Sequence, residues 1–478
     1  MNKLYYNLDL SQQKLLKTNK NAIVIAGAGT GKTTTIIGKI NYLIENQKCH
    51  SSEILVISFT NASVNDIKKR INYNVNVFTF HKLAINILNM VNFEYSLCNE
   101  NFLKYIINET LVNLNKNDIK KTQKFLHINY NYKEFLYSYE FQSFKNIIFT
   151  FINLFKANDL KYHDLKKIRY KKNEKKVLLI IFKIYNRYIQ EKRSINKLDF
   201  DDLINYATKL VNKTSLNYKY IIIDEFQDTS LIRFNLIKNI QKKCNSRLIV
   251  VGDDWQSIYR FSGCDLNIFL NFQKHFPEST KIYLQNTYRN SQELINIASK
   301  FITKNPLQIK KKLCSNKNQK NPIIFVPYKN EKSILKDILN KLENENNIMI
   351  ISRNNHDILN YIDDEFTFED NILIYKSKTI KYYSIHKSKG LEADIVIILN
   401  CNSNKFGIPN KIENNILIEK TFKNNEIKYA EERRLFYVAL TRTKNEIYLL
   451  YNKNYPSIFI KEIKKLIKEE KKEINYFD

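Results

Sequence analysis

The segment that most restricts the fold of this 478-residue chain is residues 21–36, NAIVIAGAGTGKTTTI. An apolar run of strand length is followed by a glycine-rich turn and then by a threonine-rich stretch that can begin a helix. Glycine is otherwise scarce, because the whole chain holds only 8, and three of them are Gly27, Gly29 and Gly31. The segment therefore predicts a strand, a phosphate-binding loop and a helix in direct succession.

This loop has the spacing of a nucleotide phosphate site, with alanine at the first position, where the strict pattern has glycine. Glycines let successive backbone N–H groups turn toward a phosphate, Lys32 reaches the β and γ oxygens, and the Thr33 hydroxyl can bind Mg²⁺. We expect ATP to be held here by a continuous run of residues: Ala26, Gly27, Ala28, Gly29, Thr30, Gly31, Lys32, Thr33 and Thr34.

An acidic pair follows a second apolar run, Tyr220–Ile223. Asp224 is placed to bind Mg²⁺ together with Thr33, and Glu225 to orient or deprotonate the attacking water, which is the division of labour that in-line phosphoryl transfer requires. Acidic pairs at strand ends are often structural. Beside a phosphate loop, however, this pair favours ATP hydrolysis with Mg²⁺ as the cofactor.

Further short apolar runs at Ile54–Phe59, Leu248–Val251, Ile348–Ile351 and Ile395–Leu399 are separated by helical-looking segments. Continuous apolar strands indicate parallel sheets that are covered on both faces. Between them, apolar residues recur at helical spacing, and residues 101–195 hold 20 Lys and Arg against 8 Asp and Glu.

We therefore predict an α/β fold with two parallel-sheet units and a basic helical insertion in the first. Residues 1–81 and 200–285 form the first unit in this interpretation, residues 82–199 the insertion, and residues 286–478 the second unit. A Lys- and Asn-rich stretch near 311–321 is expected to be a linker.

The net charge of +29, from 77 Lys and Arg against 48 Asp and Glu, has two interpretations. It fits a polyanionic partner, but with 65 Lys and only 12 Arg it also fits the codon bias of an AT-rich genome. Nucleic-acid binding must therefore be argued from individual sites. The 6 cysteines are widely spaced without a CxxC pair, and no apolar run approaches the roughly 18 residues of a membrane span. We expect a cytoplasmic protein with no membrane contact.

In chain order, these and further motifs resemble the superfamily 1 DNA helicases of the UvrD/Rep type, and within that family the helicase IV branch. The matching segments are Leu8–Gln13, the phosphate loop, Phe59–Asn61, Thr79–His81, Asp224–Asp228 (DEFQD), Val251–Gly263, Asn286–Arg289, Ile385–Glu392 and Ala430–Arg442. The resemblance implies that both sheet units are RecA-like.

The resemblance also implies roles for single residues. At the nucleotide, Gln12 (with Gln13 as an alternative) would read adenine, Tyr288 would stack on it, and Glu392 would meet the ribose. Gln256, Arg289 and Arg442 would act at the γ-phosphate as catalytic residues beside Lys32, Asp224 and Glu225. The residues implied for DNA binding are Thr60, Asn61, Thr79, His81, Tyr259, Phe261 and His386.

Scarce arginine supports this assignment, because 5 of the 12 fall in these motifs: Arg260, Arg289, Arg433, Arg434 and Arg442. A planar charged fork suits contacts with phosphate that lysine cannot copy. Arg433 and Arg434 could instead form a surface ion-pair cluster with the neighbouring glutamates. Trp255 could serve the core or the site, and Tyr259 and Phe261 could be core filler rather than platforms for bases.

The function implied is that of an ATP-dependent helicase that moves 3′ to 5′ on single-stranded DNA, acting as a monomer at single strands and junctions in repair, recombination or replication. Only 94 residues separate Arg289 from Ser384, too few for the large additional subdomain of UvrD-type enzymes. The alternative is therefore a single-strand translocase, a protein-displacing enzyme or a phage-defence ATPase with little unwinding activity and an unidentified partner. A small-molecule kinase or a passive binding protein would not need Gln256, Arg289 and Arg442 in this order, and no nuclease signature follows the last motif.

Overall fold

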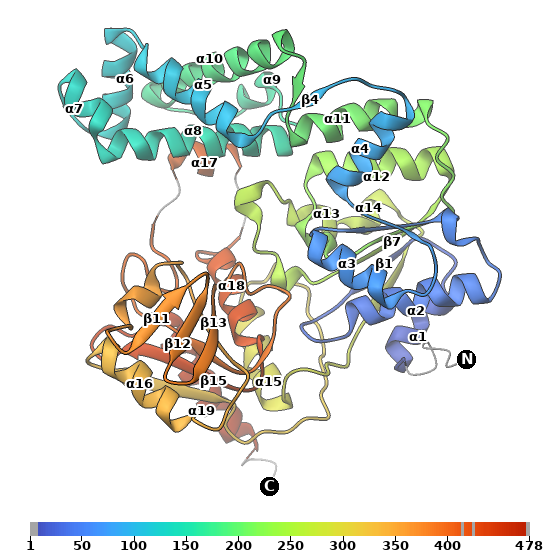
Figure 1. Cartoon of the computed structure of the whole chain (residues 1–478), viewed down its shortest axis with the longest axis vertical. Coiled ribbons are helices and arrows are strands. Elements are labelled where there is room, and N and C mark those ends of the chain that lie inside the picture. Colours follow the sequence, from blue (N-terminus) through green and yellow to red (C-terminus); the bar gives the residue numbers. More distant parts are fainter. Residues whose placement is uncertain (1–7, 413–414, 423–425, 475–478) are drawn as a thin grey trace.

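The computed structural model describes residues 8–412, 415–422 and 426–474, with side chains through residue 470. Its described residues form two large β-sheets, a two-stranded pair and a block of helices (Figure 1). The fold class is confirmed as α/β with a parallel first sheet and a second sheet. None of the helices in the described ranges is long and apolar enough to cross a membrane.

The first sheet has six parallel strands in the order β3-β2-β6-β7-β1-β8. Their bounds are β1 Ala22–Ile25, β2 Ile54–Ser58, β3 Asn76–Thr79, β6 Tyr220–Ile223, β7 Arg247–Gly252 and β8 Thr280–Tyr283. In the register, Val24 lies between Val251 and Ile282. The strands expected within residues 21–36 and at 54–59, 220–223 and 248–251 are confirmed as β1, β2, β6 and β7.

Both faces of this sheet are buried, as the continuous apolar runs predict. Ile23 and Ile25 pack with α4 (Phe80–Met90), α11 (Phe200–Leu210) and α12 (Leu231–Cys244) on one face. Val24 packs with α2 (Lys32–Glu45) and α3 (Asn61–Arg70) on the other face. The short helix α1 (Leu10–Lys17) lies beside α2 and β8.

The helical block comprises α5 Glu100–Val112, α6 Lys116–Leu126, α7 Tyr132–Tyr137, α8 Tyr139–Ala157, α9 Tyr162–Leu165 and α10 Lys172–Ser194. It has its own hydrophobic core. A short parallel pair, β4 (Ser96–Leu97) and β5 (Lys197–Leu198), lies where the chain enters and leaves it. The N-cap Asp199 of α11 accepts hydrogen bonds from Lys192 of α10 at 2.5 Å and from Tyr188 at 2.7 Å, and it pairs with Lys156 of α8. These buried charges fix the block to the first sheet.

The second sheet has seven strands in the order β11-β12-β13-β10-β14-β15-β9. The strands are β9 Ile323–Tyr328, β10 Ile348–Ser352, β11 Phe366–Glu369, β12 Ile372–Tyr375, β13 Lys378–Ser384, β14 Ala393–Ile398 and β15 Thr443–Asn452. Helices α15 Gln292–Ile302, α16 Glu331–Lys341, α18 Ala430–Leu440 and α19 Ile458–Ile474 accompany it. This sheet differs from the all-parallel expectation at one edge, where β12 runs antiparallel to its neighbours β11 and β13. Asp370 and Asn371, with φ of 47° and 64°, supply the left-handed turn that such a tight hairpin needs.

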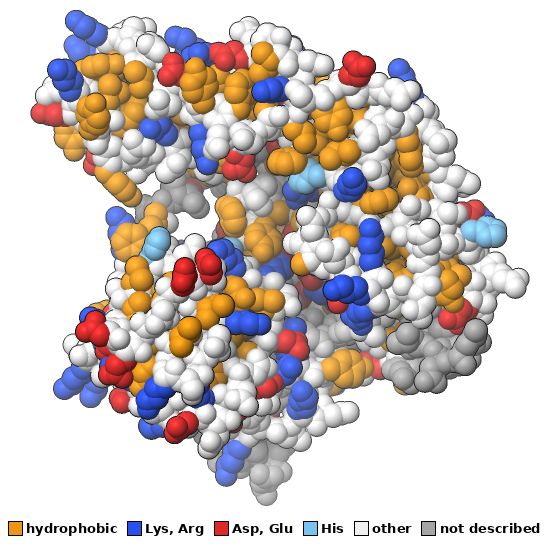
Figure 2. Space-filling model, in the orientation of Figure 1, with side chains coloured by type: hydrophobic (Ala, Val, Ile, Leu, Met, Phe, Trp, Pro, Cys, Tyr) orange, Lys and Arg blue, Asp and Glu red, His pale blue; other side chains and the backbone are white. Residues whose placement is uncertain are grey.

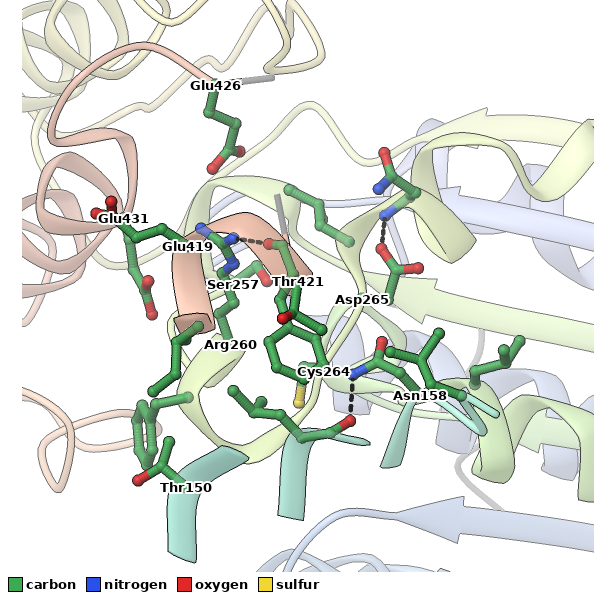
Figure 3. A pocket seen from close by; sticks show the side chains of 18 of the residues that line it. Thr150, Asn158, Ser257, Arg260, Cys264, Asp265, Glu419, Thr421, Glu426 and Glu431 are labelled. Atoms are coloured by element: carbon green, nitrogen blue, oxygen red, sulfur yellow. Dashed lines mark hydrogen bonds between the residues drawn. The ribbon is translucent and has the colours of Figure 1, made fainter. Parts of the chain in front are cut away.

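A segment between β14 and α18 leaves the second sheet and docks on the helical block (Figure 1). This short helix, α17 (Ile416–Thr421), buries Leu417 completely in the core of the block. Lys420 contacts Glu174 of α10 at 2.6 Å, and Thr421 Oγ1 lies 2.6 Å from the Tyr170 hydroxyl. A cavity of about 790 Å³ lies beside α17, with Thr150 of α8 and its C-cap Asn158 on one side of it and Glu426 and Glu431 on the other (Figure 3).

The expectation of a linker near 311–321 is wrong for its first residues. Lys311 has a side chain that is only 2% exposed, and Leu313 fills the space in front of Gly27, where a Cβ atom would lie 2.6 Å from it. Cys314 donates its backbone N–H to Gln285 at 2.8 Å and accepts from Thr287 at 2.8 Å. The Lys-rich composition predicts that this stretch is exposed to solvent, but its first residues pack behind the phosphate loop.

Candidate nucleotide and DNA site

The phosphate loop connects β1 to α2 and depends on two left-handed glycines. Gly29 and Gly31 have φ of 70° and 73°, a conformation that side chains with a Cβ rarely adopt. A Cβ on Gly29 would also lie 2.6 Å from the Cβ of Arg289. Ala26 donates its N–H to the Gly252 carbonyl at 2.9 Å, which anchors the loop to β7. The backbone N–H groups at the start of α2 suit an anion.

Lys32 belongs to a charged cluster formed by the phosphate loop, the acidic pair and Asp253. Its Nζ is 2.7 Å from Glu225 Oε1, and Thr33 Oγ1 lies 3.4 Å from Asp224 Oδ2. Burial would lower the pKa of Lys32, but Glu225 and Asp224 outweigh this effect and raise it. The ammonium is therefore charged at neutral pH.

The two carboxylates are shifted in opposite directions. Burial and the neighbouring charge of Glu225 raise the pKa of Asp224 to about 6. Burial also acts to raise the pKa of Glu225, but the positive charges of Lys32 and Lys389 prevail and lower it to about 2. Glu225 has φ of 52°, a strained conformation for a non-glycine residue, and accepts from Gln227 Nε2 at 2.5 Å. Its carboxylate is thus ionised and held in one orientation.

Gln12 and Tyr288 converge beside Gly31. A Cβ on Gly31 would lie 2.8 Å from Gln12 Nε2 and 3.9 Å from the Tyr288 ring. Gln12 Nε2 donates to the Thr30 carbonyl at 3.2 Å, and the Tyr288 hydroxyl donates to Asp9 Oδ2 at 2.8 Å. Gln13, the alternative to Gln12, instead donates to the Leu8 carbonyl at 2.7 Å. The Tyr288 side chain is exposed, which leaves a ring face open.

Gln256 and Arg442 meet although they lie 186 positions apart. Arg442 Nη2 donates to Gln256 Oε1 at 2.9 Å, and Gln256 Nε2 donates to Asp253 Oδ2 at 2.6 Å. Burial and the charge of Arg289 lower the pKa of Arg442. Arg442, which directly precedes β15 of the second sheet, therefore contacts Gln256, which follows β7 of the first sheet.

Arg289 and Glu392 form an ion pair next to the phosphate loop. Arg289 Nε donates to Glu392 Oε2 at 2.7 Å and its Nη1 donates to the Thr441 carbonyl at 3.2 Å. The preceding Tyr288 donates its backbone N–H to the Gly29 carbonyl at 2.9 Å. The segment that carries Arg289 is thus in direct contact with the loop.

Three of the residues expected at DNA form one aromatic cluster. The Phe261 ring lies 5.4 Å from the His386 ring and 6.0 Å from the Tyr259 ring, measured between centroids. Tyr259 donates its hydroxyl to the His386 carbonyl at 3.1 Å, whereas Phe261 is 56% exposed. Burial, reinforced by nearby Arg353 and Lys389, lowers the pKa of His386 to about 4, so the ring is neutral at pH 7. Phe261 is the exposed member of this cluster.

The other expected DNA residues lie where β2 and β3 give way to α3 and α4. Thr60 and Thr79 are the N-caps of α3 and α4, and Asn61 is the exposed first residue of α3. His81 packs on the Phe200 ring at 4.9 Å, and burial together with Arg233 lowers its pKa to about 4. Both histidines would therefore offer hydrogen bonds and ring faces, not charge.

Arg433, Arg434 and Trp255 are structural in this fold. Arg433 is buried and contacts Glu462 at 2.5 Å, while Arg434 pairs with Glu426 and donates to the Ser257 carbonyl at 2.7 Å. The alternative that Arg433 and Arg434 form a surface ion-pair cluster with the neighbouring glutamates is wrong. Both arginines are buried, and their ion-pair partners are Glu462 and Glu426. Trp255 is completely buried, and its Nε1 donates to the Ile309 carbonyl at 3.0 Å.

Lys389, which lies in the Ile385–Glu392 motif, pairs with Asp228 and donates to the Gln256 carbonyl at 2.8 Å, which joins the second unit to the first. Two cations near the site, Arg233 and Lys311, lie outside the motifs and did not emerge from the sequence. Arg233 lies over the Phe59 and Phe80 rings, 5.2 and 5.8 Å from their centroids. Lys311 lies behind the loop. The scarcity of arginine could have drawn attention to Arg233, but Lys311 is one of many lysines.

The surface is hollowed between the helical block and the second sheet (Figure 2). On this face Lys and Arg side chains are scattered and do not gather in one patch. The bulk charge therefore gives no separate support for a nucleic-acid surface on this face.

A phosphate loop, a strand-end acidic pair and an arginine brought from a second sheet define a P-loop nucleotide-binding protein with two α/β units. Residues 8–277 match the UvrD/REP helicase N-terminal domain, and residues 368–454 match the UvrD-like helicase C-terminal domain. The chain belongs to the UvrD/REP helicase family.

Several curated proteins are similar to the chain. It is 34% identical to DNA helicase IV of Escherichia coli K12 over 276 residues, which is 57% of this chain and 40% of that protein. It is 29% identical to ATP-dependent DNA helicase Rep of Buchnera aphidicola subsp. Schizaphis graminum over 80% of this chain and 56% of that protein. ATP-dependent DNA helicase PcrA of Staphylococcus aureus is 28% identical over 64% of this chain and 41% of that protein. The chain spans about half the length of the curated relatives it matches.

Proposed function

We propose that this protein is an ATP-hydrolysing motor that moves 3′ to 5′ along single-stranded DNA and opens duplexes in repair, recombination or replication. The observation that supports this most is the meeting of Arg442 with Gln256 beside the cluster of Lys32 and Glu225. An arginine delivered from one unit to phosphates held by another acts only when the units are close together. Hydrolysis is thereby tied to domain motion, which is what a motor needs.

In this proposal residues 1–81 and 200–285 form the first ATP-binding unit, residues 82–199 are an insertion in it, and residues 286–478 form the second unit without a large inserted subdomain. The nucleotide lies between the two units. Its base contacts Gln12 and Tyr288, and its ribose lies near Glu392.

Hydrolysis needs a metal, and the donors fit Mg²⁺, because Thr33 and Asp224 offer the hydroxyl and carboxylate oxygens that this ion prefers. Bound Mg²⁺ supplies positive charge to the phosphate oxygens. Lys32, Arg289 and Arg442 add charge to the phosphates, and Gln256 contacts the γ-phosphate. Glu225, ionised at neutral pH, orients the attacking water and accepts its proton.

The DNA strand would stack a base on the exposed ring of Phe261, in line with the roughly 1–3 kcal/mol that such stacking contributes per base without reading sequence. Tyr259 and His386 support that ring from behind. Thr60, Asn61, Thr79 and His81 would contact the strand backbone at the ends of β2 and β3.

A second candidate is a translocase that displaces proteins, or serves phage defence, with little unwinding. The observation in its favour is that the 94 residues between Arg289 and Ser384 contain only α15, β9, α16, the 3-10 turn Asp357–Asn360, β10 to β13 and their connections.

Unwinding assays on duplexes with a 3′ or a 5′ single-stranded tail distinguish the two candidate functions. Unwinding of the 3′-tailed duplex supports the first, and streptavidin displacement from the strand without unwinding supports the second.

The decisive experiment measures ATP hydrolysis with and without a short single-stranded oligonucleotide. Lys32→Ala serves as the inactive reference, and Lys48→Ala, at an exposed position, as the matched control. We expect strong stimulation by DNA in the wild type and the Lys48 variant and none in the Lys32 variant. Hydrolysis that ignores DNA would refute the motor, and hydrolysis retained by Lys32→Ala would refute the site.

A further inference from the structure

Lys311 lies in the extended segment between α15 and β9, which passes behind the phosphate loop. The segment is anchored to the first unit, since Ile309 donates its N–H to Asp254 Oδ2 at 2.8 Å and accepts from the Trp255 indole at 3.0 Å. This brings a side chain from outside the sequence motifs into contact with two of them.

The ammonium of Lys311 lies among three oxygen atoms. It donates hydrogen bonds to Asp253 Oδ1 and to the Ala26 carbonyl, the latter at 2.8 Å, and it forms an ion pair with Asp254 Oδ1 at 2.7 Å. Its side chain is 2% exposed, and Nζ lies 4.5 Å from the Trp255 ring centroid. Two hydrogen bonds and two ion pairs in a buried position hold the ammonium in place.

Asp253 transmits this position to the catalytic cluster. Its Oδ1 accepts from Lys311 and from the Trp255 N–H at 3.1 Å, and its Oδ2 accepts from Gln256 Nε2 at 2.6 Å. Gln256 in turn accepts from Arg442 at 2.9 Å. An unbroken chain of polar contacts thus runs from the first residue of the phosphate loop to the arginine of the second unit.

We propose that Lys311 is a positioning residue for ATP hydrolysis: it holds Asp253, and through it Gln256, in register with the phosphate loop. This inference rests on the proposed function. Without the cation, Asp253 and Asp254 are two adjacent buried carboxylates whose repulsion displaces Asp253 toward the remaining cations Lys32 and Arg442. Gln256 then loses its alignment, and a misplacement of about 1 Å can lower a rate about 100-fold.

The test compares Lys311→Met with Lys312→Met, an exposed neighbour of the same type. We expect Lys311→Met to lower the DNA-stimulated kcat by about tenfold or more, while the Kd for a non-hydrolysable ATP analogue changes less than about twofold. Lys312→Met should match the wild type in both. If Lys311 served only folding, the variant would contain fewer folded molecules, but each folded molecule would keep the wild-type kcat. The folded fraction is measured by the stoichiometry of analogue binding.

Lys311→Arg is the second variant, in case the methionine variant does not fold. It keeps the charge, so the protein should fold, but its wider planar fork cannot meet the same three acceptors. An intermediate kcat with unchanged analogue affinity supports the proposal. A kcat equal to that of the wild type in Lys311→Arg overturns it, as does a normal kcat in a folded Lys311→Met. If the wild type itself shows no DNA-stimulated hydrolysis, the proposed function has failed instead.

Discussion

Lys39 gives a stability prediction whose sign and size follow from the structure. The residue lies on α2 with no exposed surface, and its Nζ donates to the Leu16 and Thr18 carbonyls at 2.9 and 2.8 Å. These carbonyls lie at the C-terminal end of α1, the helix that carries Gln12. Burial lowers the pKa of Lys39 to about 8, against roughly 10.4 for an unfolded lysine.

The direction of the pH dependence follows from proton binding. Below pH 8 both states carry the proton, and Lys39 adds no slope. Between about pH 8 and pH 10.4 the unfolded chain still binds the proton and the folded chain does not, so the free energy of unfolding rises with pH by up to about 1.4 kcal/mol per unit. The total gain is on the order of 3 kcal/mol.

Lys39→Met removes this titration. We expect the free energy of unfolding of the wild type, minus that of the variant, to rise by about 2 kcal/mol from pH 8 to pH 10. The free energy of unfolding is measured by urea titration, with the fluorescence of Trp255, the only tryptophan, as the signal. Lys48→Met, which alters an exposed lysine, should show no such rise relative to the wild type. A difference for Lys39→Met that stays flat between pH 8 and pH 10 would mean that Lys39 titrates normally and that the argument is wrong.

Three further outcomes are expected. Glu225→Gln should bind an ATP analogue normally but lower turnover by about 10²–10⁴-fold, because the general base is lost; near-normal turnover would remove Glu225 from that role. Tyr288→Ala should raise the KM for ATP by up to about tenfold, with kcat little changed, since a stacking contact contributes about 0.5–1.5 kcal/mol; an unchanged KM would place the base elsewhere. Glu174→Lys and Lys420→Glu should each speed the dissociation of single-stranded DNA, because α17 then detaches from the helical block beside Phe261, and the double exchange should restore the wild-type rate. If the double variant dissociates as fast as the single ones, the pair does not couple the block to the second unit.

Local patterns revealed the parts of the site that are continuous in sequence. The strand, glycine turn and helix around Lys32 are encoded within residues 21–36, since left-handed glycines and an apolar run dictate that geometry locally. The strands at 54–58, 220–223, 247–252, 348–352 and 393–398 were recognisable because their residues are buried on both faces. β11 to β13 escaped notice, because at this sheet edge buried and exposed residues alternate in short stretches.

Contacts between distant segments could not be read in this way. The docking of α17 depends on Leu417 entering the core of a block more than 220 residues earlier in the chain, and nothing in a six-residue helix announces its partner. Arg433 and Arg434 stood beside two glutamates and yet pair with Glu462 and Glu426.

The sequence by itself determined that this chain has a phosphate loop, an acidic pair and motifs in the order of its family, because each depends on residue types within a few positions. Only the tertiary structure decided that Arg442 bonds Gln256, that Phe261 is the exposed ring of its cluster, and that a lysine in an apparent linker is buried against two carboxylates behind the loop. Burial and hydrogen-bond partners depend on which surfaces meet when the sheets pack, and Lys311 is indistinguishable from Lys310 and Lys312 until they do.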